Sequence, residues 1–530
     1  MFDWAIRNAR TVDGRHGERM ADVCIRGDRI GALLPPGSCA EAARDIDASG
    51  LILTPGFIDM HRHADLLPLS DQPWSELPQG ITSMISGNCG FSVVPNSPAT
   101  FQAMRDYVAP MLGSIPDRIC GMSARAFYEL VAERPLRINC GYLVGNGDLR
   151  RSVAGFSDAP LAEGQLREIC GLLDDAFDAG ALGLSMGIMY APECYYTADQ
   201  LTAIARVAAR HQRPVIAHIR GEGRSVLESV DEMIAICRAS GARVHISHMK
   251  AAGIDMWGHA VDAMLARIRA AQREGLELSF DAYPYTAGST TLLTLLPPET
   301  LSGGTEGVLR RIADPKGRAY ILSEFAKIRD GWDNFVQSVG WDRITVAGSS
   351  RPREIGRTIS ALALEVDCAP GDFALDLLLR ESGNVPIILQ SVSADDVRKI
   401  ICEPDCIVIS DSLYSAAGLP HPRKYGAFQR FLCEYVKEEK RLSLPQAIDR
   451  ITRMPAEFLG IRDRGRLEEG CFADLVLMDW DRLRDLATYA DPVRESEGIC
   501  GVFVNGKLAF ADGKTTDEAA GVLLNHGSNQ

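Results

Sequence analysis

The sequence lacks the features that mark membrane, secreted or nucleic-acid-binding proteins. Its 530 residues contain no apolar run long enough to cross a bilayer, and the stretch from Met1 to Asn8 lacks the apolar core of a signal peptide. Basic residues form no run, and the formal net charge of -14 at pH 7 opposes contact with a polyanion. We therefore expect a cytoplasmic protein that binds neither membranes nor nucleic acid.

The cysteines form no recognisable motif. There are 14 of them, scattered along the chain and without a CxxC pair. In the absence of a signal peptide, this pattern predicts reduced thiols, most of them buried as small apolar residues. The composition, 46% hydrophobic and 24% charged, is that of an ordinary globular protein with a sizeable core.

Both ends of the chain have the pattern of short strands and turns. Apolar and polar residues alternate around Gly27-Asp28 near the start and around Asn505-Gly506 near the end, which is typical of hairpins. We predict that residues 1–54 and 462–515 pair into one small β-domain. We expect the tail beyond Thr515 to be frayed.

The middle of the chain, residues 55–461, alternates apolar runs with amphipathic helical stretches, which is the pattern of βα units around a parallel sheet. Eight such units predict a (β/α)8 barrel of the TIM type, in which chemistry gathers at the carboxyl ends of the strands. The expected strands are Gly56–Met60, Ile81–Ser86, Ile138–Val144, Ala181–Gly187, Pro214–His218, Arg243–His248, Leu276–Ala282 and Cys406–Ser410.

One stretch, residues 290–341, interrupts this alternation between the seventh and eighth expected strands. It is rich in helix formers and contains Pro297-Pro298 and Gly303-Gly304. A long insertion at this position favours a separate lid subdomain over the barrel mouth.

A His-x-His pair follows the first expected strand. Side chains two residues apart on a strand share a face, so His61 and His63 project together while Arg62 points away. Two neutral imidazoles on one face can hold a metal ion. The simpler alternative is two surface histidines in a loop.

Further potential ligands fall at the ends of other strands. Cys89, His218 and His248 follow the second, fifth and sixth strands, and Asp411 follows the eighth. Taken singly, the cysteine or a histidine is explained by burial in the core, and the aspartate by capping of a helix. Placed together on one rim, they indicate a metal site. Three other histidines lie elsewhere in the pattern and receive no role: His211, His245 and His259.

Several longer motifs carry a family resemblance. They include Pro55-Gly-Phe-Ile-Asp-Met-His-Arg-His, Gly87-Asn-Cys-Gly-Phe-Ser, Ala217-His-Ile-Arg-Gly-Glu-Gly and Asp281-Ala-Tyr-Pro-Tyr. With them, the sequence resembles the N-acyl-D-amino-acid deacylases (D-aminoacylases) of the amidohydrolase superfamily over nearly its whole length.

The resemblance implies a zinc ion held by Cys89, His218 and His248. It also implies a second, weaker site to which His61 and His63 contribute and which can share the cysteine. Many superfamily members bridge two metals with a carboxylated lysine on the fourth strand, but the fourth strand here, Gly183-Leu-Ser-Met-Gly-Ile, offers none. Cys89 is a chemically reasonable bridge, since a thiolate binds zinc strongly.

The implied reaction is hydrolysis of a small N-acyl-D-amino acid to a carboxylate and a free D-amino acid. Asp411 would act as general base and then acid. The family binds the α-carboxylate of the substrate at positions that correspond here to Lys250, Tyr283, Ser289 and Arg423. No oligomeric state is implied.

The chain also departs from the family pattern. Ser412 follows Asp411 where the family usually has glycine, and the spacing from Asp411 to Arg423 is slightly altered. Residues 290–296 contain no basic residue, which favours apolar over acidic D-side chains. Two alternatives stay open: a relative that acts on a cyclic amide, an imide or another amide, and a barrel that has lost catalysis.

Overall fold

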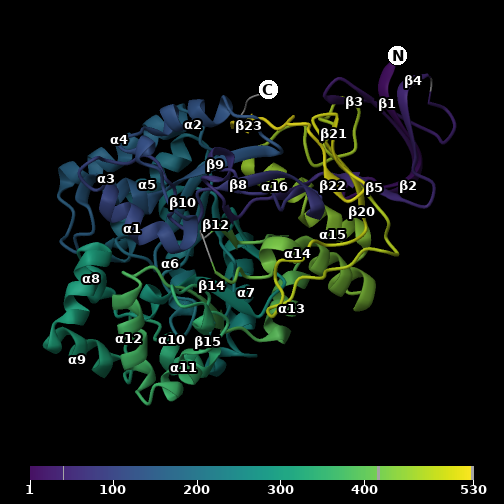
Figure 1. Cartoon of the computed structure of the whole chain (residues 1–530). Helices are drawn as coiled ribbons and strands as arrows, with labels where there is room; N and C mark the ends of the chain where they lie inside the picture. The colour runs from purple at the N-terminus through teal and green to yellow at the C-terminus, as the bar shows by residue number, and fades with distance from the viewer. Residues whose placement is uncertain (40, 415–417, 527–530) are drawn as a thin grey trace.

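The structure is a computed structural model that describes residues 1–39, 41–414 and 418–526. Eight parallel strands, in the order β17-β13-β12-β11-β10-β9-β8-β6, form the centre of this described part (Figure 1). Each overlaps one expected strand, so the prediction of a (β/α)8 barrel is confirmed. Their bounds are β6 Phe57–Asp59, β8 Ile81–Ser86, β9 Asn139–Gly145, β10 Gly183–Gly187, β11 Val215–His218, β12 Val244–Ile246, β13 Leu278–Ala282 and β17 Cys406–Val408.

Helices connect the strands and cover the outside of the barrel. Helix α5 (Ala198–Arg210) illustrates their construction: Thr197 Oγ1 accepts from the backbone N–H of Gln200, and the Gln200 side chain accepts from the N–H of Thr197. This capping box fixes the start of the helix and turns its apolar face toward the strands. The other helices of the barrel are α1 Phe101–Leu112, α2 Ala124–Ala132, α3 Asn146–Ala154, α4 Glu163–Asp178, α6 Val226–Ser240, α7 Ala260–Arg273, α13 Ala394–Cys402, α14 Arg423–Phe431, α15 Leu444–Arg450 and α16 Arg453–Leu459.

The first and last barrel strands meet at a seam that is closed beyond their ends. Strands β7 (Arg62–His63) and β18 (Ser412–Leu413) pair in parallel. Asp59, on β6, accepts from the backbone N–H of Ser410 at 3.1 Å and from the Ser410 hydroxyl. The seam therefore sets the His-x-His segment directly beside Asp411.

Arg62 points into the protein beneath this seam, as the alternation of side chains predicts. It is fully buried, and its guanidinium lies 3.1 Å from Asp59 Oδ2 and 3.0 Å from Glu76 Oε1. Its Nη2 also lies 3.1 Å from the Tyr414 hydroxyl. One cation thus balances two buried carboxylates at the point where the barrel closes.

A second sheet is built from both ends of the chain and lies apart from the barrel, at the upper right of Figure 1. Its strands follow the order β22-β21-β20-β19-β5-β1-β2-β3, and β4 pairs with β1. The predicted domain boundaries, 1–54 with 462–515 and 55–461, stay a prediction. The strands are β1 Phe2–Asp13, β2 Gly17–Arg26, β3 Arg29–Leu34, β4 Ala42–Asp47, β5 Ile52–Pro55, β19 Leu475–Met478, β20 Ile499–Val504, β21 Lys507–Ala511 and β22 Lys514–Thr515.

Two expectations about this region are wrong. Cys24 and Cys39 form a disulfide, although we expected reduced thiols throughout. The tail is docked rather than frayed, because β23 (Leu523–Leu524) adds to the barrel strand β9 in parallel register. Backbone hydrogen bonding and the burial of Leu524 hold the tail in place. Residues 527–530, the end of the predicted frayed tail, lie outside the described residues.

The segment inserted between β13 and β17 is longer than the predicted interval 290–341. It contains a three-stranded antiparallel sheet in the order β14-β16-β15, and two of its strands lie beyond residue 341. Figure 1 shows the helices of the insertion below the barrel. The elements are β14 Ala287–Thr291, β15 Ile344–Val346, β16 Pro386–Gln390, α8 Gly304–Ala313, α9 Pro315–Glu324, α10 Phe335–Val339, α11 Ile359–Glu365 and α12 Pro370–Arg380.

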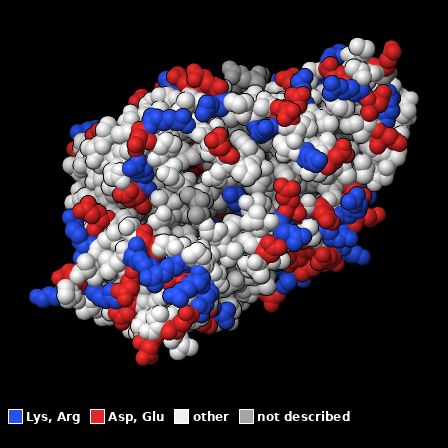
Figure 2. All heavy atoms as spheres, in the orientation of Figure 1, with Lys and Arg blue, Asp and Glu red and all other residues white. Residues whose placement is uncertain are grey.

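Charges of both signs are interspersed over the surface. Figure 2 shows acidic and basic side chains intermixed on one face of the molecule. Among the residues that the structure describes, no helix combines the length and apolar character needed to span a membrane.

The buried position of Arg62 generates a prediction about stability. Arg62→Met leaves Asp59 and Glu76 without their cation, so we expect the free energy of unfolding to fall by about 3 to 5 kcal/mol. Urea denaturation followed by circular dichroism measures this change. The control is Arg310→Met, which removes an exposed i,i+4 partner of Glu306 and should cost less than about 1 kcal/mol. Equal effects of the two substitutions would contradict the buried-cluster account.

Candidate active site

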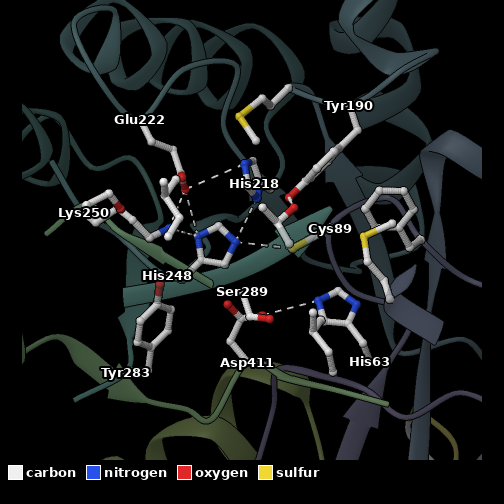
Figure 3. Close-up of a pocket in the computed structure, with 18 of the residues that line it drawn as sticks. His63, Cys89, Tyr190, His218, Glu222, His248, Lys250, Tyr283, Ser289 and Asp411 are labelled. Carbon is white, nitrogen blue, oxygen red and sulfur yellow. Dashed lines mark hydrogen bonds and ion pairs between the residues drawn. The ribbon is translucent and has the colours of Figure 1, made fainter. Parts of the chain in front are cut away.

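A cavity of about 570 Å³ opens at the carboxyl ends of the barrel strands. The insertion forms part of its wall, since Phe335 of α10, Ser289 of β14 and Leu389 of β16 line it. Most of the predicted site residues face this cavity (Figure 3): His63, Cys89, His218, His248, Lys250, Tyr283, Ser289 and Asp411. His61 and Arg423 are buried beside it.

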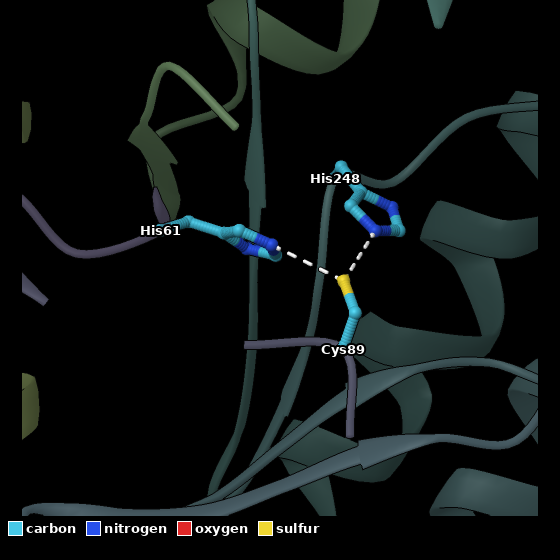
Figure 4. A group of neighbouring side chains, drawn as sticks. All are labelled: His61, Cys89 and His248. Atoms are coloured by element: carbon cyan, nitrogen blue, oxygen red, sulfur yellow. Dashed lines mark hydrogen bonds between the residues drawn. The ribbon is translucent and has the colours of Figure 1, made fainter. Parts of the chain in front are cut away.

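Cys89 is the centre of the candidate metal site. Its Sγ lies 3.3 Å from His61 Nε2 and 3.3 Å from His248 Nε2 (Figure 4). His61 also belongs to a second potential metal-binding group, with His63 and Asp411. The second strand, the sixth strand and the seam thus bring their donors to one point.

His218 joins the same assembly through His248. Its Nδ1 lies 2.9 Å from His248 Nε2, and its buried Nε2 makes no hydrogen bond but lies 3.7 Å from Glu222 Oε1. An unpartnered buried imidazole nitrogen is costly unless it binds something. The donor set of one sulfur and several imidazole nitrogens is the set that zinc takes in proteins, so these residues fit a zinc ion.

The electrostatics of the donors agree with this assignment. Burial lowers the pKa of His63 to about 4 and lowers the pKa of His218 and of His248, so these imidazoles are neutral donors at pH 7. Burial also raises the pKa of the Cys89 thiol well above its usual value. A bound cation reverses that effect, because a coordinating thiol is deprotonated.

Glu222 is a site residue that the sequence did not reveal. Its Oε1 lies 2.6 Å from Lys250 Nζ and 3.0 Å from His248 Nδ1. Burial opposes its charge, but the Lys250 ammonium and a hydrogen bond from His248 outweigh burial and lower the pKa of Glu222. It follows His218 by four residues in a turn rather than a helix, so no periodic pattern pointed to it.

Asp411 is held as a carboxylate. Burial opposes its ionisation, but Arg423, whose Nη1 lies 2.8 Å from Oδ2, and His63, whose Nε2 lies 3.3 Å from Oδ1, lower its pKa well below the usual range. Ser412 lies behind this pair: its hydroxyl oxygen is 2.7 Å from Ser410 Oγ and 3.4 Å from the Arg423 carbonyl, and its one hydrogen can be donated to either. Ser412 therefore links the seam to Arg423.

The predicted carboxylate-binding residues lie on one side of the cavity. Figure 3 shows Lys250 and Tyr283 on that side, with Tyr190 and Cys89 across from them. The guanidinium carbon of Arg423 lies 4.7 Å from the centre of the Tyr283 ring, and its Nη2 lies 3.4 Å from the Ser289 carbonyl. Arg423 thus borders this side while its Nη1 pairs with Asp411.

His245, which we gave no role, lies behind the metal-binding residues. Its Nε2 donates to Asp281 Oδ2 at 3.0 Å, and the same oxygen lies 3.4 Å from His61 Nδ1. A carboxylate behind a ligating imidazole fixes the ring's orientation. The other two histidines lie away from the cavity, since His211 pairs with Asp174 and His259 is exposed.

The loop that carries Cys89 has an unusual backbone. Gly87, Cys89 and Gly90 all have positive φ, and that of Cys89 is 54°, a conformation that costs energy for a residue with a Cβ. Ser185, on the fourth strand, holds both sides of the turn: its hydroxyl donates to the Gly87 carbonyl and accepts from the Gly90 N–H at 3.1 Å. Ser185 thus holds the conformation that aims the thiol at the imidazoles.

Comparisons with known proteins agree with this geometry. Residues 44–295 and 416–510 match a family model described as "Amidohydrolase family". An N-acyl-D-glutamate deacylase of Alcaligenes xylosoxydans xylosoxydans is 34% identical over 96% of this chain and 94% of its own, and an N-acyl-D-aspartate deacylase of the same organism is 30% identical over 98% and 95%. A crystal structure of an N-acyl-D-glutamate deacylase from Bordetella bronchiseptica superposes with a TM-score of 0.84 at 31% identity, over 99% of both chains. That structure contains zinc and a phosphonate mimic of the tetrahedral intermediate.

The role of Ser185 generates a prediction about metal binding. Ser185→Ala releases the Gly87–Gly90 turn, so we expect zinc affinity, measured by competition with a chelator, to fall by about 10- to 100-fold. The thiolate-to-cobalt absorption band of the cobalt-loaded protein should shift or weaken with it, which a general loss of stability would not produce. Ser323→Ala, at an exposed position in α9, is the control. An unchanged affinity and spectrum in Ser185→Ala would contradict this role.

Glu193, behind the same loop, generates a prediction about pH. It accepts from Gly187 N–H at 2.9 Å and from Asn146 Nδ2 at 2.8 Å, and burial raises its pKa to about 7. Because this pKa is raised on folding, the stability linked to the protonated acid is present below about pH 4.5 and is lost as pH rises through about 7.

Glu193→Gln removes the loss of stability that Glu193 causes as pH rises, because a glutamine side chain does not ionise. We compare the free energy of unfolding of the variant with that of the natural protein. The difference, variant minus natural protein, should rise by about 3 kcal/mol between pH 4.5 and 8. Urea denaturation across this range measures the difference, and Glu306→Gln, at an exposed position in α8, is the control. A difference independent of pH would contradict the prediction.

Proposed function

Because the chain belongs to the amidohydrolase family, we propose that it is a zinc-dependent deacylase that hydrolyses N-acyl-D-amino acids to a carboxylate and a free D-amino acid. One observation carries the proposal: a single cavity places a cysteine–histidine cluster and an ionised aspartate opposite a group suited to bind a carboxylate. An N-acyl amino acid has an amide and an α-carboxylate at a fixed separation, which matches this arrangement.

We assign Cys89, His218 and His248 as the zinc ligands. His61 and His63 complete a second, weaker site that shares the cysteine. The closeness of Cys89 to His61 and His248 supports these roles for the three residues, and His218 joins them through its 2.9 Å contact with His248. When bound, zinc supplies a Lewis acid that makes a water nucleophilic at neutral pH and polarises the amide carbonyl.

Asp411 moves the proton. Contact with Arg423 and His63 keeps it ionised, so it is ready to accept the proton of the attacking water. The same carboxyl group then donates that proton to the nitrogen of the departing amine, which must be protonated to leave. Asp411 is therefore both the general base and the general acid.

Lys250, Tyr283, Ser289 and Arg423 orient the substrate. An ammonium, two hydroxyls and a guanidinium suit the α-carboxylate, and the guanidinium can bind it with two hydrogen bonds. With the carboxylate and the amide carbonyl both fixed, only one hand of the amino acid can direct its side chain into the pocket. Selection of one hand thus follows from the two fixed points together with the pocket for the side chain.

The remaining walls favour an apolar side chain on the D-amino acid. Among the described residues that line the cavity, Lys250 is the one cation, and it is already paired with Glu222. Phe91, Met111 and Leu413 supply apolar surface. A cytoplasmic location also belongs to the proposal and rests on the sequence alone.

Paired N-acetyl-D- and N-acetyl-L-amino acids test the reaction. With zinc-loaded protein we expect release of free amino acid from the D-series only, and release should be fastest for apolar side chains. Asp411→Asn should lower kcat by about 10²- to 10⁴-fold, because it removes general acid–base catalysis.

Asp342→Asn, at an exposed position in the insertion, is the control and should match the natural protein. Hydrolysis of cyclic amides, with neither N-acetyl series cleaved, would contradict the deacylase assignment and favour the cyclic-amide alternative. Equal rates for both hands would contradict two-point attachment.

A further inference from the structure

A second cavity, of about 560 Å³, adjoins the active-site cavity. Met189 and Tyr190, which follow β10, line both cavities and so form the partition between them. The far walls come from Tyr107 of α1 and from Leu296, Leu301 and Trp332 of the insertion. The second cavity thus lies between the barrel and the insertion, and Met189 and Tyr190 separate it from the site of the reaction.

Most of the side chains that line this cavity are apolar or aromatic, and its two charged residues are already satisfied by the fold. Arg220 donates to Glu232 and to the carbonyls of Cys194 and Tyr196. Asp333 accepts from the N–H of Gly223 at 2.7 Å and from Ser225. Neither charge needs a ligand, so the surface that remains suits an apolar one.

The position of the cavity identifies which part of a substrate reaches it. Figure 3 shows Lys250 and Tyr283 on one side of the metal-binding residues and Tyr190 on the other. The Tyr190 ring packs against His218, with ring centres 4.7 Å apart. With the α-carboxylate held beside Lys250 and the amide at the cysteine–histidine cluster, the acyl group leaves toward Tyr190.

The two side chains that separate the cavities can move to admit an acyl chain. Met189 is half-buried and unbranched, and methionine adapts readily to its surroundings. The hydrogen bond that Tyr190 makes to the insertion is long, 3.5 Å from its hydroxyl to Thr290 Oγ1. A rotation of Met189 would be needed to join the two cavities.

We propose that the second cavity is a subsite for the acyl chain of the substrate, and that this protein prefers N-acyl groups with straight medium-length chains over N-acetyl. The proposal rests on the deacylase function and adds to it the class of acyl group. The subsite contributes by removing methylene groups of the chain from water.

A series of N-acyl-D-leucines tests this inference. We would measure kcat/KM for the acetyl, butanoyl, hexanoyl and octanoyl compounds with zinc-loaded protein. Each methylene that enters the subsite should raise kcat/KM by about fourfold, as burial of a methylene predicts. A value that stays flat or falls from acetyl to hexanoyl would overturn the proposal.

Substitution of Leu301 tests the location. Leu301→Phe narrows the cavity and should lower the octanoyl-to-acetyl ratio of kcat/KM by at least about tenfold, the loss of roughly two methylenes. Leu301→Ala enlarges the cavity and should shift the preferred length to longer chains. Leu364→Phe makes the same change at a position in α11 that is 82% exposed and should leave the ratio unchanged. A loss of stability cannot shift the preferred chain length in opposite directions in the two Leu301 variants. Equal effects on the acetyl and octanoyl substrates would overturn the location.

The two proposals fail in different ways. If N-acetyl-D-leucine is hydrolysed but the series is flat, the deacylase function stands and the subsite is wrong. If no N-acyl-D-amino acid is hydrolysed, the function fails, and titration with octanoate then decides the subsite through tryptophan fluorescence. A saturable change that Trp332→Phe abolishes supports the subsite, and no change at millimolar octanoate overturns it.

Discussion

The parallel pairing of β7 with β18 is the contact on which the candidate site depends. It joins residues about 350 positions apart in the sequence: the backbone N–H of Asp411 donates to the His61 carbonyl at 2.9 Å, and Ser412 pairs with Arg62. The pairing sets two imidazoles against the aspartate that would move the proton. The buried cluster of Asp59, Arg62 and Ser410 supports it from below, so the closure of the barrel and the assembly of the site are one structural event.

The metal-binding residues are arranged in the protein at a cost that a bound cation offsets. Cys89 holds a left-handed backbone conformation, and burial disfavours its thiolate. His218 has a buried nitrogen without a hydrogen bond. The buried thiolate and the buried nitrogen are unfavourable without a ligand and become favourable once a cation coordinates them. Metal binding and local stability are therefore coupled at this rim.

Much of the fold was predictable because strands leave a direct trace in the sequence. The apolar runs marked all eight barrel strands, and the two-residue period placed Arg62 opposite His61. The family resemblance supplied the role of each residue around the cavity. Contacts between distant segments leave no such trace: Glu222 and Ser185 act through side chains whose partners are set only by tertiary folding. The docked tail was missed for the same reason, since its short pairing with β9 has no periodic pattern.

The central claim is that one cysteine and the rim histidines hold a zinc ion in this cavity. X-ray absorption at the zinc edge of the purified, zinc-loaded protein tests it most directly. The account predicts a single sulfur neighbour at about 2.3 Å together with nitrogen neighbours at about 2.0 to 2.1 Å, and loss of the sulfur in Cys89→Ala. A zinc environment made only of oxygen and nitrogen in the natural protein would contradict it.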